Sequence, residues 1–229
     1  MKRVAILVCL ALPACTSYEY EEDVSLEVDG SGRIRISGSA PMFHALLGIE
    51  DPSTEALGEF FNSQQVEIES IRRTERDGRS FFHVRMIFAS WNDVCRHRAF
   101  RDRGCSLVFG ASDRVLTLVL PRPRGGPEKN VDPGATLGFR FHFPSTVLEH
   151  NAPHGVERGN ILGWRRTWRA HRDGPPLQIS ARFDDRSVLS ATVRVLVAAL
   201  GIVGASIATA LILVVRRGRR QIASDPQSA

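Results

Sequence analysis

The sequence lacks the recurring motifs of catalysis and cofactor binding. It contains no Gly-x-Ser-x-Gly elbow, no His-Glu-x-x-His motif, no Gly-x-x-x-x-Gly-Lys loop and no dinucleotide fingerprint. His150 beside Glu149, and His154 near Glu157, form acid-base pairs without a third group to orient them. Surface positions in turns are the better interpretation of both pairs. We therefore expect a protein that is not an enzyme and has no cofactor.

The middle of the chain also lacks net charge. Residues 15–194 hold 24 basic and 24 acidic groups, although the whole chain carries +5. A basic folded domain, the usual basis of nucleic-acid binding, is therefore excluded, and we expect no nucleic-acid partner. With 43% hydrophobic residues in the chain, this middle is long enough for one domain with a real core.

The N-terminus has the three parts of a bacterial secretory signal. Lys2 and Arg3 precede an apolar run that ends in Leu12-Pro13-Ala14-Cys15. The last four residues resemble a lipobox, which predicts a signal peptide over 1–14 and a lipidated Cys15 at the mature N-terminus. Pro13 departs from the usual small residue, so an ordinary signal peptide with a free Cys15 thiol is the alternative.

The C-terminus contains an uncharged run of 21 residues, 195–215, between Arg194 and the cluster Arg216-Arg217-Gly218-Arg219-Arg220. This length predicts a transmembrane helix, and the positive-inside rule predicts a cytoplasmic basic tail over 216–229. Together with the signal peptide, this predicts a protein of the bacterial cytoplasmic membrane. It would be lipid-anchored and single-pass, with an extracytoplasmic domain over 15–190.

The alternation of apolar and polar residues within that domain predicts mainly antiparallel strands. Even positions from Tyr18 to Val28 are mostly apolar, and Asp29-Gly30-Ser31-Gly32 supplies a turn into a second strand. Helical spacing predicts short helices at 52–63 and after Ser90. Further strands are expected at 66–71, 80–88, 105–109, 115–120, 136–143, 160–169 and 177–183. The predicted fold class is therefore α+β: one extracytoplasmic domain of antiparallel strands with two short helices, followed by the transmembrane helix.

Cysteine is scarce in this domain. Once Cys9 is removed with the signal peptide and Cys15 is lipidated, Cys95 and Cys105 are the remaining pair. An even pair in an exported domain predicts a disulfide. A metal site is not expected, because His97 is the only histidine close by and structural zinc sites need paired Cys or His clusters.

Three blocks of the chain resemble the LppM-like envelope lipoproteins of bacteria. They are the lipobox cysteine leading into the strand that ends at Asp29-Gly30-Ser31-Gly32, the segment Phe88 to Asp93, and Phe143-Pro144 followed by Asn151, Asn160 and Trp164. Ser145 stands where that family prefers Gly. The resemblance implies an α+β lipoprotein domain at the membrane surface that contacts lipids or envelope components, without established catalysis.

Charge is segregated along the domain. Residues 15–75 hold 4 basic and 13 acidic groups, whereas 76–194 hold 20 and 11. Arginine interleaved with tryptophan suits phosphate headgroups, which makes one basic stretch the candidate lipid site. Its members are Trp164, Arg165, Arg166, Trp168, Arg169 and Arg172. The alternative is that these arginines pair with the acidic N-terminal half of the same domain.

We therefore expect a non-enzymatic, membrane-anchored envelope lipoprotein that binds membrane lipid or another envelope component. The alternative is a scaffold or assembly factor that binds envelope proteins through its ectodomain and transmembrane helix.

Overall fold

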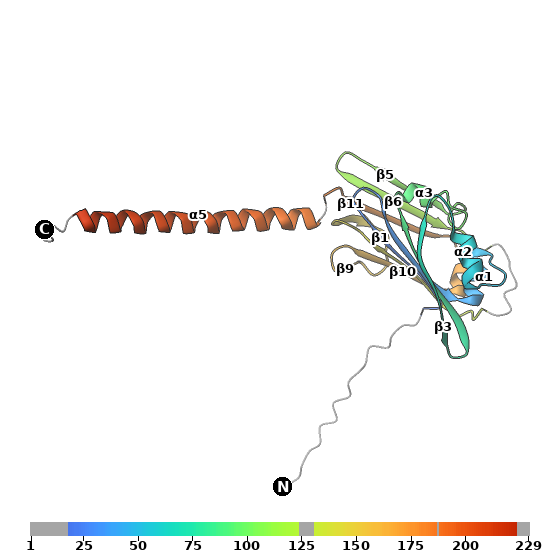
Figure 1. Ribbon diagram of the computed structural model, residues 1–229. Helices are drawn as coiled ribbons and strands as arrows, with labels where there is room; N and C mark the ends of the chain where they lie inside the picture. The colour runs from blue at the N-terminus through green and yellow to red at the C-terminus, as the bar shows by residue number, and fades with distance from the viewer. Residues whose placement is uncertain (1–17, 124–130, 187, 224–229) are drawn as a thin grey trace, which may run out of the picture.

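Two β-sheets pack face to face in the computed structural model, which describes residues 18–123, 131–186 and 188–223 (Figure 1). Sheet A has seven strands in the order β3-β4-β2-β1-β7-β10-β9, and sheet B has four in the order β5-β6-β11-β8. The strands of sheet A are β1 (Tyr20–Leu26), β2 (Gly32–Ser39), β3 (Glu67–Arg76), β4 (Arg79–Phe88), β7 (Thr136–His142), β9 (Val156–Glu157) and β10 (Ile161–Thr167). Those of sheet B are β5 (Gly104–Phe109), β6 (Asp113–Leu120), β8 (Val147–His150) and β11 (Leu177–Asp184).

Five helices are present among the described residues: α1 (Ala40–Leu47), α2 (Thr54–Phe61), α3 (Trp91–Val94), α4 (Trp168–Asp173) and α5 (Val188–Ala223). In Figure 1, α1 and α2 lie together at the end of the sandwich opposite α5. Ser53 begins α2, because its side chain accepts a hydrogen bond from the backbone N–H of Ala56 at 3.0 Å. Ser53 is therefore the N-cap, and α2 begins at Thr54, within the predicted helix 52–63.

The core lies between the sheets, and the alternation along the strands fills it. In β1, Tyr20, Val24 and Leu26 are buried on the inner face, as their even positions predict. Phe143, directly after β7, contacts Phe183 of β11 with ring centroids 4.9 Å apart. One continuous core therefore joins the two sheets.

The predicted fold class is wrong in two respects. Sheet A is mixed, because β1 pairs in parallel with β7 while its other neighbour, β2, is antiparallel. There are also more helices than the two predicted. After β4, the chain crosses to sheet B, forms β5 and β6 there, and returns to sheet A to form β7 beside β1. This long connection allows β7 to run parallel to β1, which lies in the middle of sheet A.

The predicted transmembrane helix is also corrected. Within the described ranges, no helix is long and apolar enough to span a membrane. The segment 195–215 is instead part of α5, a 36-residue helix that continues through the arginine-containing flanks on both sides. The predicted single-pass topology with a cytoplasmic C-terminus is therefore not supported. The predicted signal peptide and Cys15 lie outside the described residues.

Candidate functional site

The disulfide predicted from the sequence is present. Cys95, at the end of α3, is bonded to Cys105 in β5, with their Cα atoms 5.7 Å apart. The bond closes a short loop that contains four arginines, and it sets the position of one of them, Arg103, directly before β5.

Arg103 is the centre of a buried polar cluster at the helix end of the sandwich. Its Nη1 atom donates to Oε2 of Glu22 at 2.6 Å, and both side chains are at most 8% exposed. The Tyr20 hydroxyl donates to the other oxygen of Glu22. Burial, the largest single effect, lowers the pKa of Arg103, but the interactions with Glu22 and Tyr20 together outweigh it, so the pKa is raised and the guanidinium stays charged.

His171 of α4 is the fourth buried polar side chain in this region. It is 1% exposed, and its Nδ1 atom has no hydrogen-bond partner in the described part of the chain. Burial, followed by the charges of Arg166 and Arg103, lowers the pKa of His171 to about 4. The imidazole is therefore neutral at pH 7.

A pocket of about 480 Å³ opens beside Arg103 and His171, and we call it the end pocket. The C-terminal part of α1 and the end of β6 supply its apolar wall, which includes Ala45, Leu46, Leu47 and Leu120. Its polar lining includes Arg98, Arg122, Glu50 and Asp102 as well as the two buried groups. A pocket of this size with an apolar wall and a few convergent polar groups is typical of a small-molecule site.

Arginines also gather around Asp173, at the end of α4. Hydrogen bonding by Arg172, and then the charges of Arg172, Arg169 and Arg122, lower the pKa of this carboxyl group. Arg122 also lines the end pocket. Three arginines around one aspartate leave an excess of positive charge near the pocket.

The predicted headgroup residues do not lie on one surface. Trp164 and Trp168 are buried in the core, at 3% and 2% exposure. Arg166 donates to the carbonyl of Pro175 at 3.1 Å. Arg165 projects from the face of β10 opposite to that of Trp164 and Arg166. The predicted strand 160–169 ends at Thr167, so Arg169 and Arg172 belong to α4. The structure therefore separates Arg165 from the arginines near the end pocket.

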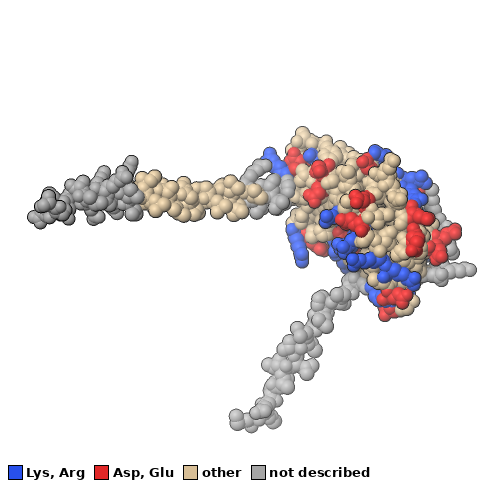
Figure 2. Space-filling model, viewed as in Figure 1, with Lys and Arg blue, Asp and Glu red and all other residues tan. Residues whose placement is uncertain are grey.

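Several other arginines of the second half pair with acidic residues of β1 or with Glu19 directly before it. Arg79 donates to Glu19 at 2.7 Å, and Arg140 lies 4.0 Å from Glu21 and 3.9 Å from Asp23. Figure 2 shows the result on one face of the molecule, where basic and acidic side chains are interspersed. Part of the charge segregation seen in the sequence is therefore neutralised within the domain.

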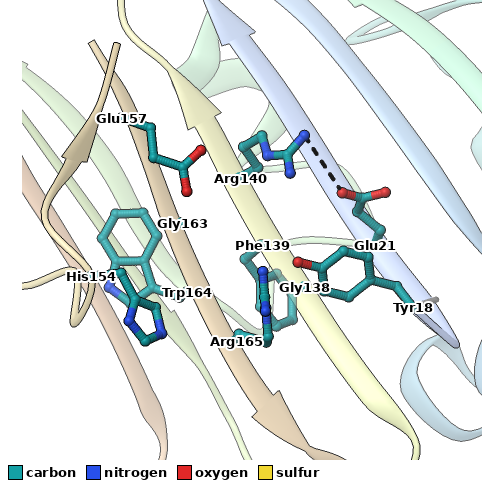
Figure 3. Close-up of a pocket in the computed structure, with 10 residues that line it drawn as sticks. All are labelled: Tyr18, Glu21, Gly138, Phe139, Arg140, His154, Glu157, Gly163, Trp164 and Arg165. Carbon is teal, nitrogen blue, oxygen red and sulfur yellow. Dashed lines mark ion pairs between the residues drawn. The ribbon is translucent and has the colours of Figure 1, made fainter. Parts of the chain in front are cut away.

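A second, smaller site lies on the outer face of sheet A, and Figure 3 shows it. We call it the outer-face groove. It crosses β1, β7 and β10 and encloses about 30 Å³. Tyr18, Arg140, His154, Glu157 and Arg165 surround it, and Gly138 and Gly163 lie between them. The groove thus brings the predicted pair His154 and Glu157 together with Arg165 of the predicted headgroup site.

Sequence reasoning missed Glu22, although a signal was present. Glu22 occupies an even position in β1, among the apolar residues that face the core. A carboxylate on the buried face of a strand needs a partner, because an isolated buried charge is very costly. The partner itself, 81 residues away in the chain, has no local signature.

Comparisons with known proteins add one structural likeness. No protein-family model matches the chain, and no curated protein matches it. Among solved structures, the chain is similar to the folded domain of LppM from Mycobacterium tuberculosis, determined by NMR. The two are 13% identical, the match covers 73% of this chain and 90% of that one, and the TM-score is 0.41.

Proposed function

We propose that this protein is a non-enzymatic envelope lipoprotein whose domain binds the polar end of an anionic lipid in the end pocket. The observation that carries the proposal is the combination, in one pocket, of an apolar wall with buried polar groups. Ala45, Leu46, Leu47 and Leu120 offer contacts for hydrocarbon, and Arg103 and His171 lie beside them.

The arginines around Asp173 support an anionic headgroup. Arg122 and Arg169 make no side-chain hydrogen bond within the described residues, so their donors are available to a phosphate oxygen. Guanidinium groups bind phosphate strongly because their fork of donors matches its oxygens. The volume of about 480 Å³ suits a headgroup and the first part of an acyl chain.

The disulfide and the lipobox support an exported location. Disulfides persist in oxidising compartments outside the cytoplasm, and Leu12-Pro13-Ala14-Cys15 has the pattern of a lipidation site. Metabolic labelling with a fatty acid tests the anchor: the label should be incorporated by the parent and lost in Cys15→Ala. Equal labelling of both would place the acyl group elsewhere and contradict the anchor at Cys15.

Lipid binding is tested by titrating the purified protein with a fluorescent phosphatidylglycerol analogue at low salt. Arg122→Gln combined with Arg169→Gln should weaken binding by at least tenfold, since each arginine near anionic lipid contributes about 1 kcal/mol. Ala45→Leu should weaken binding, because the larger side chain would narrow the end pocket at its apolar wall. A phosphatidylcholine analogue should bind less tightly than the anionic one to the parent.

The matched control removes two charges elsewhere. Arg35→Gln with Arg85→Gln alters neighbouring positions on the outer face of sheet A, which pair across β2 and β4. This control should bind the anionic analogue as the parent does. Equal loss of binding in both double variants would indicate non-specific attraction to the surface, and the proposal would fail.

The alternative function, a scaffold for other envelope proteins, is favoured by one observation. The edge strand β5 exposes Val108 at 57% and Phe109 at 49%. An exposed apolar edge is a surface to which a partner strand adds. Val108→Lys would abolish capture of such a partner and leave lipid binding in the end pocket unchanged.

A further inference from the structure

Gly163, in the middle of β10, is a glycine that the backbone does not require. Its φ is not positive, and the register of β10 against β7 runs without a bulge. A Cβ atom added at Gly163 would meet nothing within 4 Å. Glycine weakens a strand interior, and in the absence of a bulge or bend it marks a place where something approaches the backbone closely.

The neighbouring Gly138 has a different explanation. A Cβ atom at this position would lie 2.7 Å from the ring of Tyr18, so the glycine makes room for that ring. The guanidinium carbon of Arg165 lies over the ring of Tyr18, 5.2 Å from the centroid of that ring. The protein itself therefore fills the space over Gly138, whereas the space over Gly163 is open.

The side chains around this open space are poor in internal hydrogen bonds. Arg140, His154, Glu157 and Arg165 make no side-chain hydrogen bond to any described residue, and Arg140 approaches its acidic neighbours only at 3.9 and 4.0 Å. In Figure 3 they surround the glycines from three strands. Hydrogen-bond donors and acceptors thus surround the backbone of Gly163, which has no side chain to fill the space between them.

The charges of the groove are balanced. Two arginines, Arg140 and Arg165, and two carboxylates, Glu21 and Glu157, line it, so a simple anion such as phosphate would meet as much repulsion as attraction. Hydroxyl groups both donate and accept hydrogen bonds, and so match alternating guanidinium and carboxylate groups. The enclosed volume of about 30 Å³ admits a hydroxyl or hydroxymethyl group and not a whole ring.

We propose that the outer-face groove binds a neutral saccharide, with the sugar ring lying flat over Gly163 and one hydroxyl or hydroxymethyl group inserted between Arg140, Glu157 and Arg165. The aromatic side chain of Tyr18 would lie at the edge of the bound sugar ring. The site is separate from the end pocket, and it does not depend on lipid binding there.

The proposal is tested by NMR titration of the ¹⁵N-labelled full-length protein with neutral oligosaccharides of hexoses and of N-acetylhexosamines, and separately with inorganic phosphate. A neutral saccharide should shift the amide signals of Gly138, Gly163 and Arg165. Gly163→Leu, which fills the open floor, should weaken binding at least tenfold. Arg140→Met should weaken binding as well.

Gly104→Ala provides the control, because Gly104 is a strand glycine of sheet B whose added Cβ would make ordinary contacts at 3.6 and 3.7 Å. It should bind saccharide as the parent does, and both glycine variants should keep the parent's spectrum elsewhere. Three results would overturn the proposal: no neutral saccharide shifts these signals, phosphate alone shifts them, or Gly163→Leu binds as tightly as the parent.

Discussion

His171 is a buried imidazole whose protonation opposes folding. Its pKa is about 4 in the folded protein and about 6.5 in an unfolded chain, so the unfolded state binds the proton more readily. Its contribution to stability is therefore complete above pH 6.5 and is lost as the pH falls towards 4. The charged groups that face it are Arg166, Arg103 and Glu22.

We expect the free energy of unfolding to fall between pH 7 and pH 4.5 by roughly 2 to 3 kcal/mol on account of His171. In the variant His171→Gln, which cannot titrate at this position, the free energy of unfolding should fall by roughly 2 to 3 kcal/mol less over the same pH range. Urea unfolding of both proteins at the two pH values measures the difference. Parallel losses in the parent and the variant would show that the imidazole accepts a proton without cost.

Gly163 and Gly32 are strand glycines for which the structure predicts opposite effects of substitution. Gly163→Thr should raise the free energy of unfolding by roughly 0.5 to 1 kcal/mol, because the new side chain meets open space and stiffens the strand. Gly32→Thr should lower it by about 1 to 3 kcal/mol, because its Cβ would lie 2.0 Å from the backbone oxygen of Ser25. Denaturant midpoints of the two variants test this contrast, and a loss of stability in Gly163→Thr would contradict it.

At the scale of the elements, the disulfide ties the end of α3 to the start of β5. It restricts the unfolded chain by closing a loop of sequence separation 10, which corresponds to roughly 2 to 3 kcal/mol in the chain-entropy model. The double variant Cys95→Ser and Cys105→Ser should unfold at a correspondingly lower denaturant concentration. Reduction of the parent should reproduce that value, and an unchanged midpoint after reduction would contradict the prediction.

The hydrogen bonds of Asn151 also connect elements. Its side-chain oxygen accepts from the indole N–H of Trp164 in β10 at 3.1 Å and from the backbone N–H of Ser180 in β11 at 3.0 Å. Its amide nitrogen donates to the carbonyl of Gln178 at 2.9 Å. Asn151 and Trp164, which carried the resemblance in sequence, therefore join the two sheets.

At the scale of the whole molecule, Glu22 and Arg103 join sheet A to the connection that leads into sheet B. Breaking a buried ion pair leaves one charge without compensation, so Glu22→Gln and Arg103→Met should each lower the free energy of unfolding by about 3 to 5 kcal/mol. The double variant should lose less than the sum of the two. Denaturant unfolding of the parent and the three variants measures this coupling.

An exposed ion pair serves as the comparison. Arg73 and Glu75 lie 3.2 Å apart on β3, with side chains 55% and 70% exposed. Glu75→Gln should change stability by less than about 1 kcal/mol. Equal effects of Glu22→Gln and Glu75→Gln on the free energy of unfolding would mean that water reaches the ion pair of Glu22 and Arg103 in solution.

The sequence by itself determined most of the individual elements of the domain. Alternation predicted β1, β4, β6, β7, β10 and β11. The strands expected at 66–71 and 80–88 correspond to β3 and β4, and the turn between them lies at Asp77 and Gly78, which both have positive φ. The cysteine count also predicted the disulfide. These features depend on neighbouring residues, so a local pattern is enough to specify them. The short helices α1 and α4 were missed, because α1 has no side-chain cap and α4 follows the alternating residues of β10 directly.

Only the tertiary structure decided how these elements combine. The parallel pairing of β1 with β7, the meeting of Glu22 with Arg103, and the open floor at Gly163 all join residues far apart in the chain. The predicted arginine and tryptophan site was divided for the same reason. Its six residues are close in sequence, but the change from β10 to α4 at Thr167 directs them to the core, to the outer face and to the vicinity of the end pocket. Sheet order and register follow from packing of the whole core, which no local stretch of sequence contains.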